Sequence, residues 1–265
     1  MTQVEFKDVT ISYKGEVILD NVSAVFPQGE STMIVGYSGS GKTSLLNCII
    51  GKVIPDKGSV LVDGKELSKA QDINLVRKNI GMLFQKSGLF QDLTIGENVA
   101  LPFYEHYPKL PKEFIDVAVK LKLEAVGLRG VIDKYPRQLS GGMERRVALA
   151  RAVALDPSLI LYDEPLTGQD PISCAVLISL ISALQNAYGA TSVIVSHQIN
   201  VLSPKVDRIC VVGKKSIIVN DTVENVFACQ DPYVQQFVSG LPDGVMPFHF
   251  PAKPINYDLS LGDII

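Results

Sequence analysis

The stretch GYSGSGKT, residues 36–43, decides the fold of this chain. It fits the pattern G-x-x-x-x-G-K-[ST], in which glycines allow backbone N–H groups to curl around a phosphate. An apolar run of strand length, Thr32–Val35, precedes it, and a helical pattern, Ser44–Ile50, follows it. A phosphate loop joins a strand to a helix, so the flanking sequence agrees with the motif. A glycine-rich turn without a ligand is the competing interpretation, and the flanking pattern disfavours it.

The residues of this turn have different predicted roles. Lys42 is expected to reach the β- and γ-phosphates of a nucleotide, and the hydroxyl of Thr43 is expected to hold Mg²⁺. The start of the following helix adds positive potential. The other predicted phosphate contacts are Gly36, Ser38, Gly39, Ser40, Gly41 and Ser44.

A second glycine pair, in Leu139-Ser-Gly-Gly-Met143, opens a predicted helix. The first N–H groups of a helix have no partner within it, so Ser140, Gly141 and Gly142 form a candidate anion site. No lysine stands beside these glycines, and the chain already contains a complete phosphate loop. The motif therefore raises the question of whose phosphate the second site takes.

The remaining pattern is that of an α/β protein. Unbroken apolar runs of strand length indicate parallel strands that are covered on both faces. The region Val4–Phe26 alternates instead and has a turn signal at Lys14-Gly15, which predicts an antiparallel part. The predicted parallel strands are Thr32–Val35, Leu159–Tyr162, Ser192–Val195 and Ile209–Val212.

An all-helical block of roughly 86–156 is predicted as an insertion in this core. Thr94 and Glu97 fit a capping box that opens a helix, and we expect Pro102 to end it. Residues 1–240 are predicted to form one domain that contains the block, and the proline-rich residues 241–265 an extended tail. A second helix is expected over 112–126, from apolar residues at helical spacing: Phe114, Val117, Ala118, Leu121 and Ala125.

Two adjacent carboxylates, Asp163 and Glu164, follow the apolar run Leu159–Tyr162. Sheets of α/β proteins bind ligands at the carboxyl ends of their strands, so functional polar groups are expected there. Asp163 is placed to support a Mg²⁺ ion, and Glu164 is placed to polarise an attacking water. Adjacent acids at a solvated strand edge are the competing interpretation.

Three further residues are candidates for the same site. His197 follows the strand 192–196 and is placed to hydrogen-bond a γ-phosphate. Gln85 ends the apolar run Gly81–Phe84 where the helical block begins, and we assign it to catalysis and to the Mg²⁺ ion. Tyr13, at the end of an early strand, is placed to stack on adenine, and packing in the core is the alternative.

The composition restricts the classes of protein to which the chain can belong. Of its 265 residues, 46% are hydrophobic, which is typical of a folded globular protein. The net charge is −3 and the isoelectric point about 5.7, whereas nucleic-acid binders usually carry a basic excess. The first residues, MTQVEFKD, lack the pattern of a signal peptide. The run Cys174–Leu184 is too short to span a bilayer, so we expect a soluble chain whose membrane role needs a partner.

The cysteines and arginines receive structural interpretations. The four cysteines lie far apart and are expected to be free, mostly buried thiols in a reducing setting. A basic group is expected to be a helix face that meets solvent or a partner rather than nucleic acid. Its members are Arg137, Arg145, Arg146 and Arg151.

Together these motifs resemble the ATP-binding subunits of ABC transporters. LSGGM at 139–143 is similar to the signature motif of that family, and the order of the motifs is similar as well. The resemblance implies a P-loop NTPase (RecA-like) ABC nucleotide-binding domain that binds ATP and Mg²⁺ and hydrolyses ATP. It also implies that the signature of one copy holds the γ-phosphate of ATP bound to a second copy, with Asp170 nearby. Two copies facing head to tail would then complete two sites.

Longer stretches resemble the Mla-type ATPases of the Mce lipid-transport systems. They are MLFQKSGLFQDLTIGENVALP (82–102), LKLEAVGLRG (121–130), TGQDPI (167–172) and DGVMPFHFPA (243–252). The resemblance implies ATP-driven transport of phospholipids between the inner and outer membranes of bacteria. It implies a homodimer at the cytoplasmic face of the inner membrane, with a separate integral permease, an Mce-domain protein and a STAS-domain subunit. The chain departs from the usual patterns at Tyr37, Ser44, Lys86 and Gln198.

Three alternatives remain open. The ATPase subunit of an importer for a polar solute, such as an amino acid, would carry the same motifs. ABC proteins that act on ribosomes or DNA generally have two ATPase halves in one chain or long coiled-coil insertions, and the sequence shows neither. A nucleotide-dependent scaffold without turnover is disfavoured because Glu164 and His197 are both present.

Overall fold

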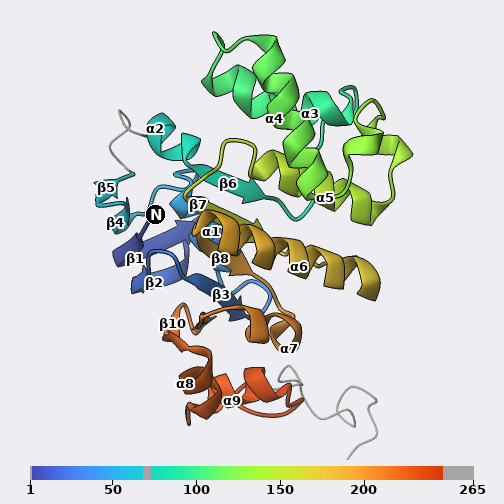
Figure 1. Ribbon diagram of the computed structural model, residues 1–265. Helices are drawn as coiled ribbons and strands as arrows, with labels where there is room; N and C mark the ends of the chain where they lie inside the picture. Colours follow the sequence, from blue (N-terminus) through green and yellow to red (C-terminus); the bar gives the residue numbers. More distant parts are fainter. Residues whose placement is uncertain (1, 68–72, 247–265) are drawn as a thin grey trace, which may run out of the picture.

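Two sheets and a group of helices make up this protein, which a computed structural model describes for residues 2–67 and 73–246. The sheets lie in the middle of the molecule, α3 and α4 lie at one end, and α8 and α9 lie at the other (Figure 1). The predicted tail lies outside the described residues from position 247 onward. The division of the chain into a domain of 1–240 and a tail of 241–265 stays a prediction.

The larger sheet confirms the predicted parallel core. Its strand order is β10-β9-β3-β8-β7-β6, and all neighbours pair in parallel except β10 with β9. Every residue of β3, β7 and β8 is buried, which explains why these runs are continuously apolar. The strands are β3 (Ser31–Gly36), β6 (Ile80–Leu83), β7 (Leu159–Asp163), β8 (Thr191–Val195), β9 (Arg208–Gly213) and β10 (Ser216–Thr222).

The smaller sheet confirms the predicted antiparallel part. Its order is β2-β1-β4-β5, with all pairs antiparallel. Lys14 and Gly15 both have positive φ, 51° and 83°, as the tight turn between β1 and β2 requires. α1 (Lys42–Ile49) lies against both sheets, since Leu45 shares one buried cluster with Phe6 of β1 and Leu161 of β7. The strands are β1 (Val4–Tyr13), β2 (Glu16–Phe26), β4 (Lys57–Val62) and β5 (Lys65–Glu66).

All regular elements between β6 and β7 are helices, and they form the upper end of the molecule in Figure 1. We call α3, α4 and α5 with the short helices η1 and η2 the helical block. A small helix, α2 (Ile73–Lys78), precedes β6. The members of the block are α3 (Ile95–His106), α4 (Lys112–Ala125), η1 (Arg129–Val131), η2 (Pro136–Gln138) and α5 (Gly141–Ala152).

The first helix of the block begins as predicted and ends later than predicted. The capping box of Thr94 and Glu97 is present. The prediction that Pro102 ends the helix is wrong, because α3 continues to His106. Proline removes one helical N–H, but burial of Val99 and Phe103 holds the helix on both sides of it. The N–H of Tyr107 then bonds to the carbonyl of Phe103 at 2.7 Å and closes the last turn.

The second helix of the block has two apolar faces. α4 confirms the predicted helix, and Ile115, Val119 and Leu123 form its buried face. Phe114, on the other face, is 67% exposed, and Val117 and Leu121 beside it are 57% and 65% exposed. The residues whose spacing predicted the helix are therefore mostly those that do not pack.

The apolar helix after β7 is longer than the predicted run of 174–184. α6 (Pro171–Tyr188) begins behind Asp170, whose carboxylate accepts hydrogen bonds from two backbone N–H groups of its first turn. It ends at Gly189, which has a φ of 58°. Its 18 residues have the length and hydropathy of a membrane-spanning helix. That criterion is also met by core helices, and α6 buries one side in the core through Leu177, Ile178, Ile181 and Leu184.

The C-terminal helices pack against the turn that follows β3. Tyr37 makes edge-on contacts with Tyr233 and Phe237 of α9, with ring centroids 5.5 and 5.7 Å apart. Gln236 of α9 is buried and holds Met246 by donating to its carbonyl at 3.0 Å and accepting from its N–H at 2.9 Å. The elements here are α7 (Ile199–Leu202), η3 (Ser203–Lys205), α8 (Val223–Ala228) and α9 (Pro232–Ser239).

Candidate functional site

A hollow of about 380 Å³ opens beside the turn between β3 and α1. We call it the phosphate-loop hollow. Nine of the predicted site residues meet there, although they come from four separate parts of the chain. Ile18 and Val195 also line it and were not predicted. The full lining is Tyr13, Ile18, Ser38, Gly39, Gly41, Lys42, Thr43, Ser44, Gln85, Glu164 and Val195.

Lys42 is held inside its own loop. Its Nζ donates to the carbonyl of Gly36 at 2.8 Å and to that of Tyr37 at 2.7 Å. Burial lowers the pKa of Lys42, while Glu164 and Asp163 act in the opposite direction. Among the described residues, the ammonium group has only neutral carbonyl acceptors in direct contact, and a phosphate oxygen would be a stronger acceptor for it.

Two glycines of the loop allow other groups to come close to its backbone. Gly36 has a φ of 150°, and a Cβ at this position would lie 2.2 Å from the carbonyl oxygen of Val212. Gly39, in contrast, has a φ of 83° and open space where a Cβ would stand. The hydroxyl of Ser40 is buried without a hydrogen-bond partner among the described residues. A loop with an open glycine, a buried lysine and an unpaired hydroxyl fits a phosphate group.

Thr43 and Asp163 come together where a cation would be needed. The Thr43 hydroxyl donates to the Asp163 carboxylate at 3.5 Å. Burial and the charge of Glu164 raise the pKa of Asp163, and Thr43 and Lys42 partly offset this shift. No group of three or more His, Cys, Asp or Glu side chains gathers within the described part of the chain. The hydroxyl and carboxylate therefore fit Mg²⁺ that also keeps oxygen ligands from phosphate and water.

Glu164 and His197 form a pair at the edge of the hollow. Glu164 Oε2 lies 2.9 Å from His197 Nδ1 and accepts from the Thr167 hydroxyl at 3.2 Å. The backbone of Glu164 has a φ of 46°, a conformation that costs energy for a non-glycine residue and is often found at functional sites. Two contacts thus fix the carboxylate, and the backbone N–H of Glu164 donates to the carbonyl of Val195 at 2.9 Å.

Tyr13 and Gln85 both line the phosphate-loop hollow. Tyr13 is 44% exposed, so the alternative of core packing does not hold for it. Its hydroxyl accepts a hydrogen bond from Ser44 at 3.4 Å. Gln85 is exposed and lines the hollow directly after β6. Both side chains are therefore accessible to a bound nucleotide.

The second glycine pair lies apart from this hollow. Among the described residues, those that line the hollow do not include Ser140, Gly141, Gly142 or Asp170. Ser140 caps α5 by accepting from the N–H of Met143 at 3.3 Å, and it is exposed together with Gly141. We call Leu139–Met143 the signature turn. Within one molecule it has no part in the phosphate-loop hollow.

Asp170 has a local task that the sequence did not reveal. Both of its carboxylate oxygens are used within α6, one by two backbone N–H groups and the other by the Ser173 hydroxyl at 2.6 Å. These hydrogen bonds from Ser173 and Ile172 lower the pKa of Asp170. Its predicted contact with a nucleotide stays a prediction.

The expectation of a solvent-facing basic group is wrong for part of that group. Arg145 is only 7% exposed, and it donates to the carbonyls of Phe84 and Thr167. Burial lowers its pKa, and Glu144 acts against that shift. Arg151 donates to the carbonyls of residues 87 and 88, and only Arg137 has an exposed side chain. No sequence pattern indicated that these arginines hold loops in place.

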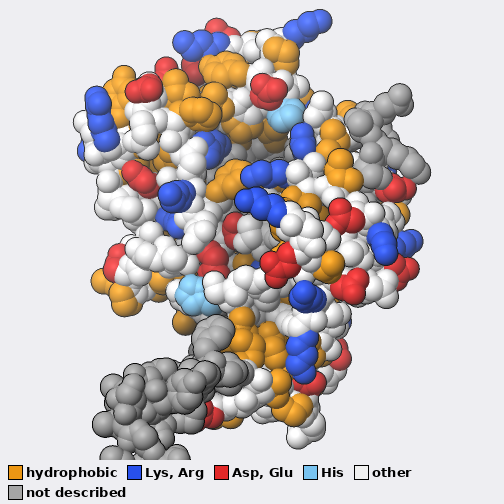
Figure 2. All heavy atoms as spheres, turned by 180° about the vertical axis from the view of Figure 1, so that it is seen from behind, with side chains coloured by type: hydrophobic (Ala, Val, Ile, Leu, Met, Phe, Trp, Pro, Cys, Tyr) orange, Lys and Arg blue, Asp and Glu red, His pale blue; other side chains and the backbone are white. Residues whose placement is uncertain are grey.

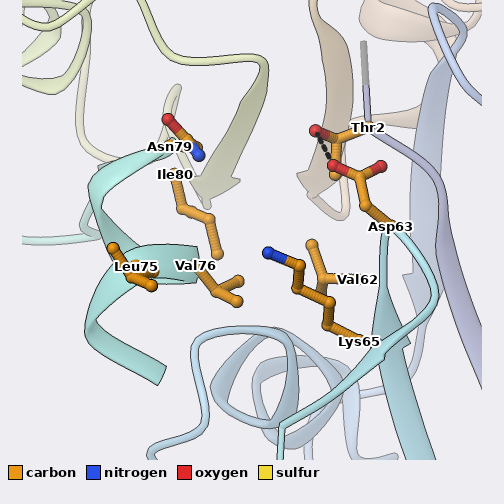
Figure 3. A pocket seen from close by; sticks show the side chains of 8 residues that line it. All are labelled: Thr2, Val62, Asp63, Lys65, Leu75, Val76, Asn79 and Ile80. Carbon is orange, nitrogen blue, oxygen red and sulfur yellow. Dashed lines mark hydrogen bonds between the residues drawn. The ribbon is translucent and has the colours of Figure 1, made fainter. Parts of the chain in front are cut away.

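A smaller hollow, of about 40 Å³, lies at the opposite edge of the larger sheet. Figure 3 shows Lys65 extending between Val62 and Val76, and Thr2 donating to Asp63 at 3.0 Å. It lies at the amino end of β6, whereas α/β sheets bind ligands at the carboxyl ends of their strands. Its size and place exclude it as the nucleotide site.

Comparisons with known proteins agree with this geometry. The pattern of the family described as ABC transporter matches residues 19–167. The chain is 44% identical over 261 residues to the intermembrane phospholipid transport system ATP-binding protein MlaF of Escherichia coli (strain K12), covering 98% of this chain and 97% of that protein. It is 44% identical over 252 residues to the protein of the same name from Haemophilus influenzae, covering 94% and 95%.

A solved structure supports the fold. The ATP-binding cassette MJ0796, in a dimeric post-hydrolysis state bound to ADP and Pi, is similar to this protein with a TM-score of 0.76. The two are 31% identical, and the match covers 83% of this chain and 98% of that chain.

Proposed function

This chain belongs to the ABC transporter family of ATP-binding proteins, and from that premise we propose that it hydrolyses ATP to drive phospholipid transport between two membranes. The cargo is the one named for its relatives from Escherichia coli and Haemophilus influenzae. Identity of 44% over nearly the whole of each chain supports the same role here.

The observation that carries the proposal is the division of phosphate-binding groups over two surfaces. Lys42 lies in the hollow, whereas Ser140 and the glycines after it lie outside it. A nucleotide held by Lys42 of one molecule would be completed by the signature turn of a second molecule. Two copies related by a twofold axis would then share two ATP sites. The dimeric form of the similar cassette supports this arrangement.

The residues of one chain have separate tasks in such a site. Lys42 binds and orients the β- and γ-phosphates, and Tyr13 stacks on the adenine. Glu164 takes a proton from the attacking water, with its carboxylate oriented by His197 and Thr167. General base catalysis of this kind contributes on the order of 100-fold to 10,000-fold to a rate.

Mg²⁺ supplies charge neutralisation at the phosphate oxygens when it is bound. Thr43 and Asp163 are the groups that would hold it, with Gln85 at the mouth of the hollow. Asp170 is assigned to the second surface, where it holds the start of α6 beside the signature turn.

The exposed apolar face of the helical block is the proposed docking surface for a membrane permease. Large apolar side chains gather over this end of the molecule in Figure 2, and an apolar patch of this kind is typical of an interaction site. The residues concerned include Tyr104, Tyr107, Phe114, Val117 and Leu121.

The proposed assembly is a homodimer at the cytoplasmic face of the bacterial inner membrane. It includes an integral permease, an Mce-domain protein and a STAS-domain subunit. Copurification from detergent-solubilised membranes tests this part, and an Mce-domain protein should be recovered with the ATPase. Recovery of a six-helix solute permease with a periplasmic binding protein would contradict the lipid cargo.

Mixed pairs test the shared site. One chain carries Lys42→Ala and the other carries Ser140→Ala, and pairs that contain one of each are purified through two different tags. Each single variant should be inactive as a homodimer. A mixed pair has one composite site in which both parts are intact, so it should recover about half of the wild-type turnover per pair, since one of the two sites is whole.

The matched control places both substitutions in one chain and pairs it with a wild-type chain. This pair carries the same two changes, but each of its sites has one defective part. It should therefore stay inactive. Equal turnover in both kinds of mixed pair, or full turnover by single molecules, would contradict the shared site.

A further inference from the structure

Arg145, five positions after Ser140, connects α5, which we call the signature helix, to the loops that carry Gln85 and Glu164. Arg145 Nη1 donates to the carbonyl of Phe84 at 2.6 Å, directly before Gln85. Its Nη2 reaches the carbonyl of Thr167 at 3.4 Å, in the turn that follows Glu164. A single side chain thus touches the backbone beside two groups that line the phosphate-loop hollow.

The burial of this arginine needs a reason. A charged side chain that is 7% exposed loses most of its hydration. Its direct acceptors are two backbone carbonyls rather than a carboxylate. A plain packing role would be better filled by an apolar residue, because unpaired buried charges are unfavourable. The planar guanidinium, however, has several N–H donors in fixed directions, which lets it hold two carbonyls at once.

Further hydrogen bonds connect these loops to the side chains proposed for catalysis. The Thr167 hydroxyl donates to Glu164 Oε2 at 3.2 Å, and the same oxygen lies 2.9 Å from His197 Nδ1. On the other branch, the segment after Gln85 is fixed to α5 as well, because Arg151 donates to the Ser87 carbonyl at 3.0 Å. α5 is therefore tied to the loop of Gln85 and to the loop of Glu164.

We propose that Arg145 is a positioning residue that holds Gln85 and Glu164 in register with the signature helix of the same molecule. This inference rests on the proposed function, in which the signature turn of one molecule binds the nucleotide of the other.

Substitutions of Arg145 test the proposal, with Arg146 as the matched control. Arg146 lies on the same helix but donates to the carbonyl of Val126 within the helical block. Arg145→Gln should lower turnover at saturating ATP at least about tenfold, because small misplacement of catalytic groups is costly. Its affinity for a fluorescent ATP analogue should change less than about twofold, since Arg145 does not line the hollow. Arg146→Gln should keep both values near wild type.

Hydrogen exchange gives a readout that does not depend on turnover. Arg145→Lys keeps the charge and can hold only one of the two carbonyls well. We expect faster exchange of the amides in the turn 164–169 of this variant and little change in Arg146→Lys. Unchanged exchange in the turn of Arg145→Lys would overturn the proposal, even if Arg145→Gln fails to fold.

Mixed pairs show whether Arg145 positions the catalytic groups of its own chain or only stabilises the fold. In the pair of Lys42→Ala and Ser140→Ala chains, the one intact site takes Glu164 from the Ser140→Ala chain and the signature turn from the other. Arg145→Gln should abolish the recovered turnover when added to the chain that supplies Glu164. It should have a much smaller effect in the chain that supplies the signature turn, and the reverse result would overturn the proposal. Lack of recovered turnover before Arg145 is changed would instead contradict the proposed shared site, and the exchange experiment would still decide the role of Arg145.

Discussion

The phosphate loop and the signature turn both present backbone N–H groups at the start of a helix. They differ in how complete each is as a phosphate-binding site within one molecule. In the phosphate loop, Lys42 is buried and bonded to two carbonyls of its own loop. In the signature turn, Ser140 and Gly141 are exposed, and within the described part of the chain the serine hydroxyl bonds only to the Met143 N–H, which caps α5. The phosphate loop therefore has a cationic side chain, Lys42, and an enclosing hollow within one molecule. The described residues supply neither at the signature turn.

A single molecule thus forms the phosphate-loop half of the proposed ATP site completely, while its signature turn stays open to a second molecule. The buried lysine is stabilised in the single molecule because two of its three N–H donors bond to backbone carbonyls. An exposed helix start needs no partner, since water satisfies its N–H groups. The signature turn can therefore remain on the surface until a phosphate on another molecule reaches it.

The largest expected effect comes from Glu164→Gln, which leaves both phosphate sites intact and removes only the chemistry. Turnover should fall at least about 100-fold, as loss of a general base predicts. ATP should stay bound, and the paired form should accumulate on sedimentation. Rapid hydrolysis by this variant would remove Glu164 from its assigned role.

Substitution of one residue in each region should separate binding from turnover. Lys42→Ala removes a charged donor, so affinity for ATP should weaken about 10-fold to 100-fold in single molecules. Ser140→Ala should leave that affinity unchanged and still abolish turnover of the pair. Titration of a fluorescent ATP analogue at low protein concentration measures the first effect. An equal loss of affinity in the two variants would show that the regions are not independent.

Glycine substitutions should separate the two regions by stability. Gly36→Ala places a Cβ 2.2 Å from the Val212 carbonyl oxygen, so we expect a loss of about 1–3 kcal/mol in the free energy of unfolding. At Gly141 the nearest atom is a side-chain nitrogen of Gln169, 3.8 Å away. Gly141→Ala should therefore stay within about 0.5 kcal/mol of wild type. Urea unfolding measures both, and equal losses would contradict the contrast.

The smallest effect near neutral pH concerns Tyr233, whose ring packs against Tyr37 of the phosphate loop. Burial, with a smaller contribution from Tyr37, raises the pKa of Tyr233 from 10.0 to about 12. The neutral phenol is thus favoured in the folded state, and this stabilisation is complete below pH 10 and is lost as the pH rises towards 12. Tyr233→Phe has no such group, so over that range it should lose about 2 kcal/mol less stability than wild type, with no difference of this origin near neutral pH. Parallel stability curves of the two proteins would argue against this ionisation.

Much of the fold followed from local sequence patterns. The strands 159–163 and 191–195 are buried on both faces, so their apolar runs were visible without knowledge of the rest. The ABC transporter assignment rested on short motifs and is confirmed by the family match. The capping box at Thr94 was also read correctly, because it depends on residues only three positions apart.

What the sequence did not reveal depends on distant contacts. The end of α3 was misplaced because burial of Phe103 outweighs the effect of Pro102. The exposed face of α4 and its buried face are both apolar, so periodicity predicted the helix but not the face that packs. Arg145 looked like a surface charge, since its acceptors lie 61 and 22 positions away in the sequence.

The contact of Tyr37 with α9 ties the nucleotide loop to the far end of the chain. Tyr233 and Phe237 lie almost two hundred residues after Tyr37, yet the ring of Tyr37 contacts both of theirs. A shortened protein that stops before α9 would lack the backing of its own phosphate loop. A shortened version of this ATPase should therefore keep α9 together with Met246, which Gln236 holds through both its N–H and its carbonyl.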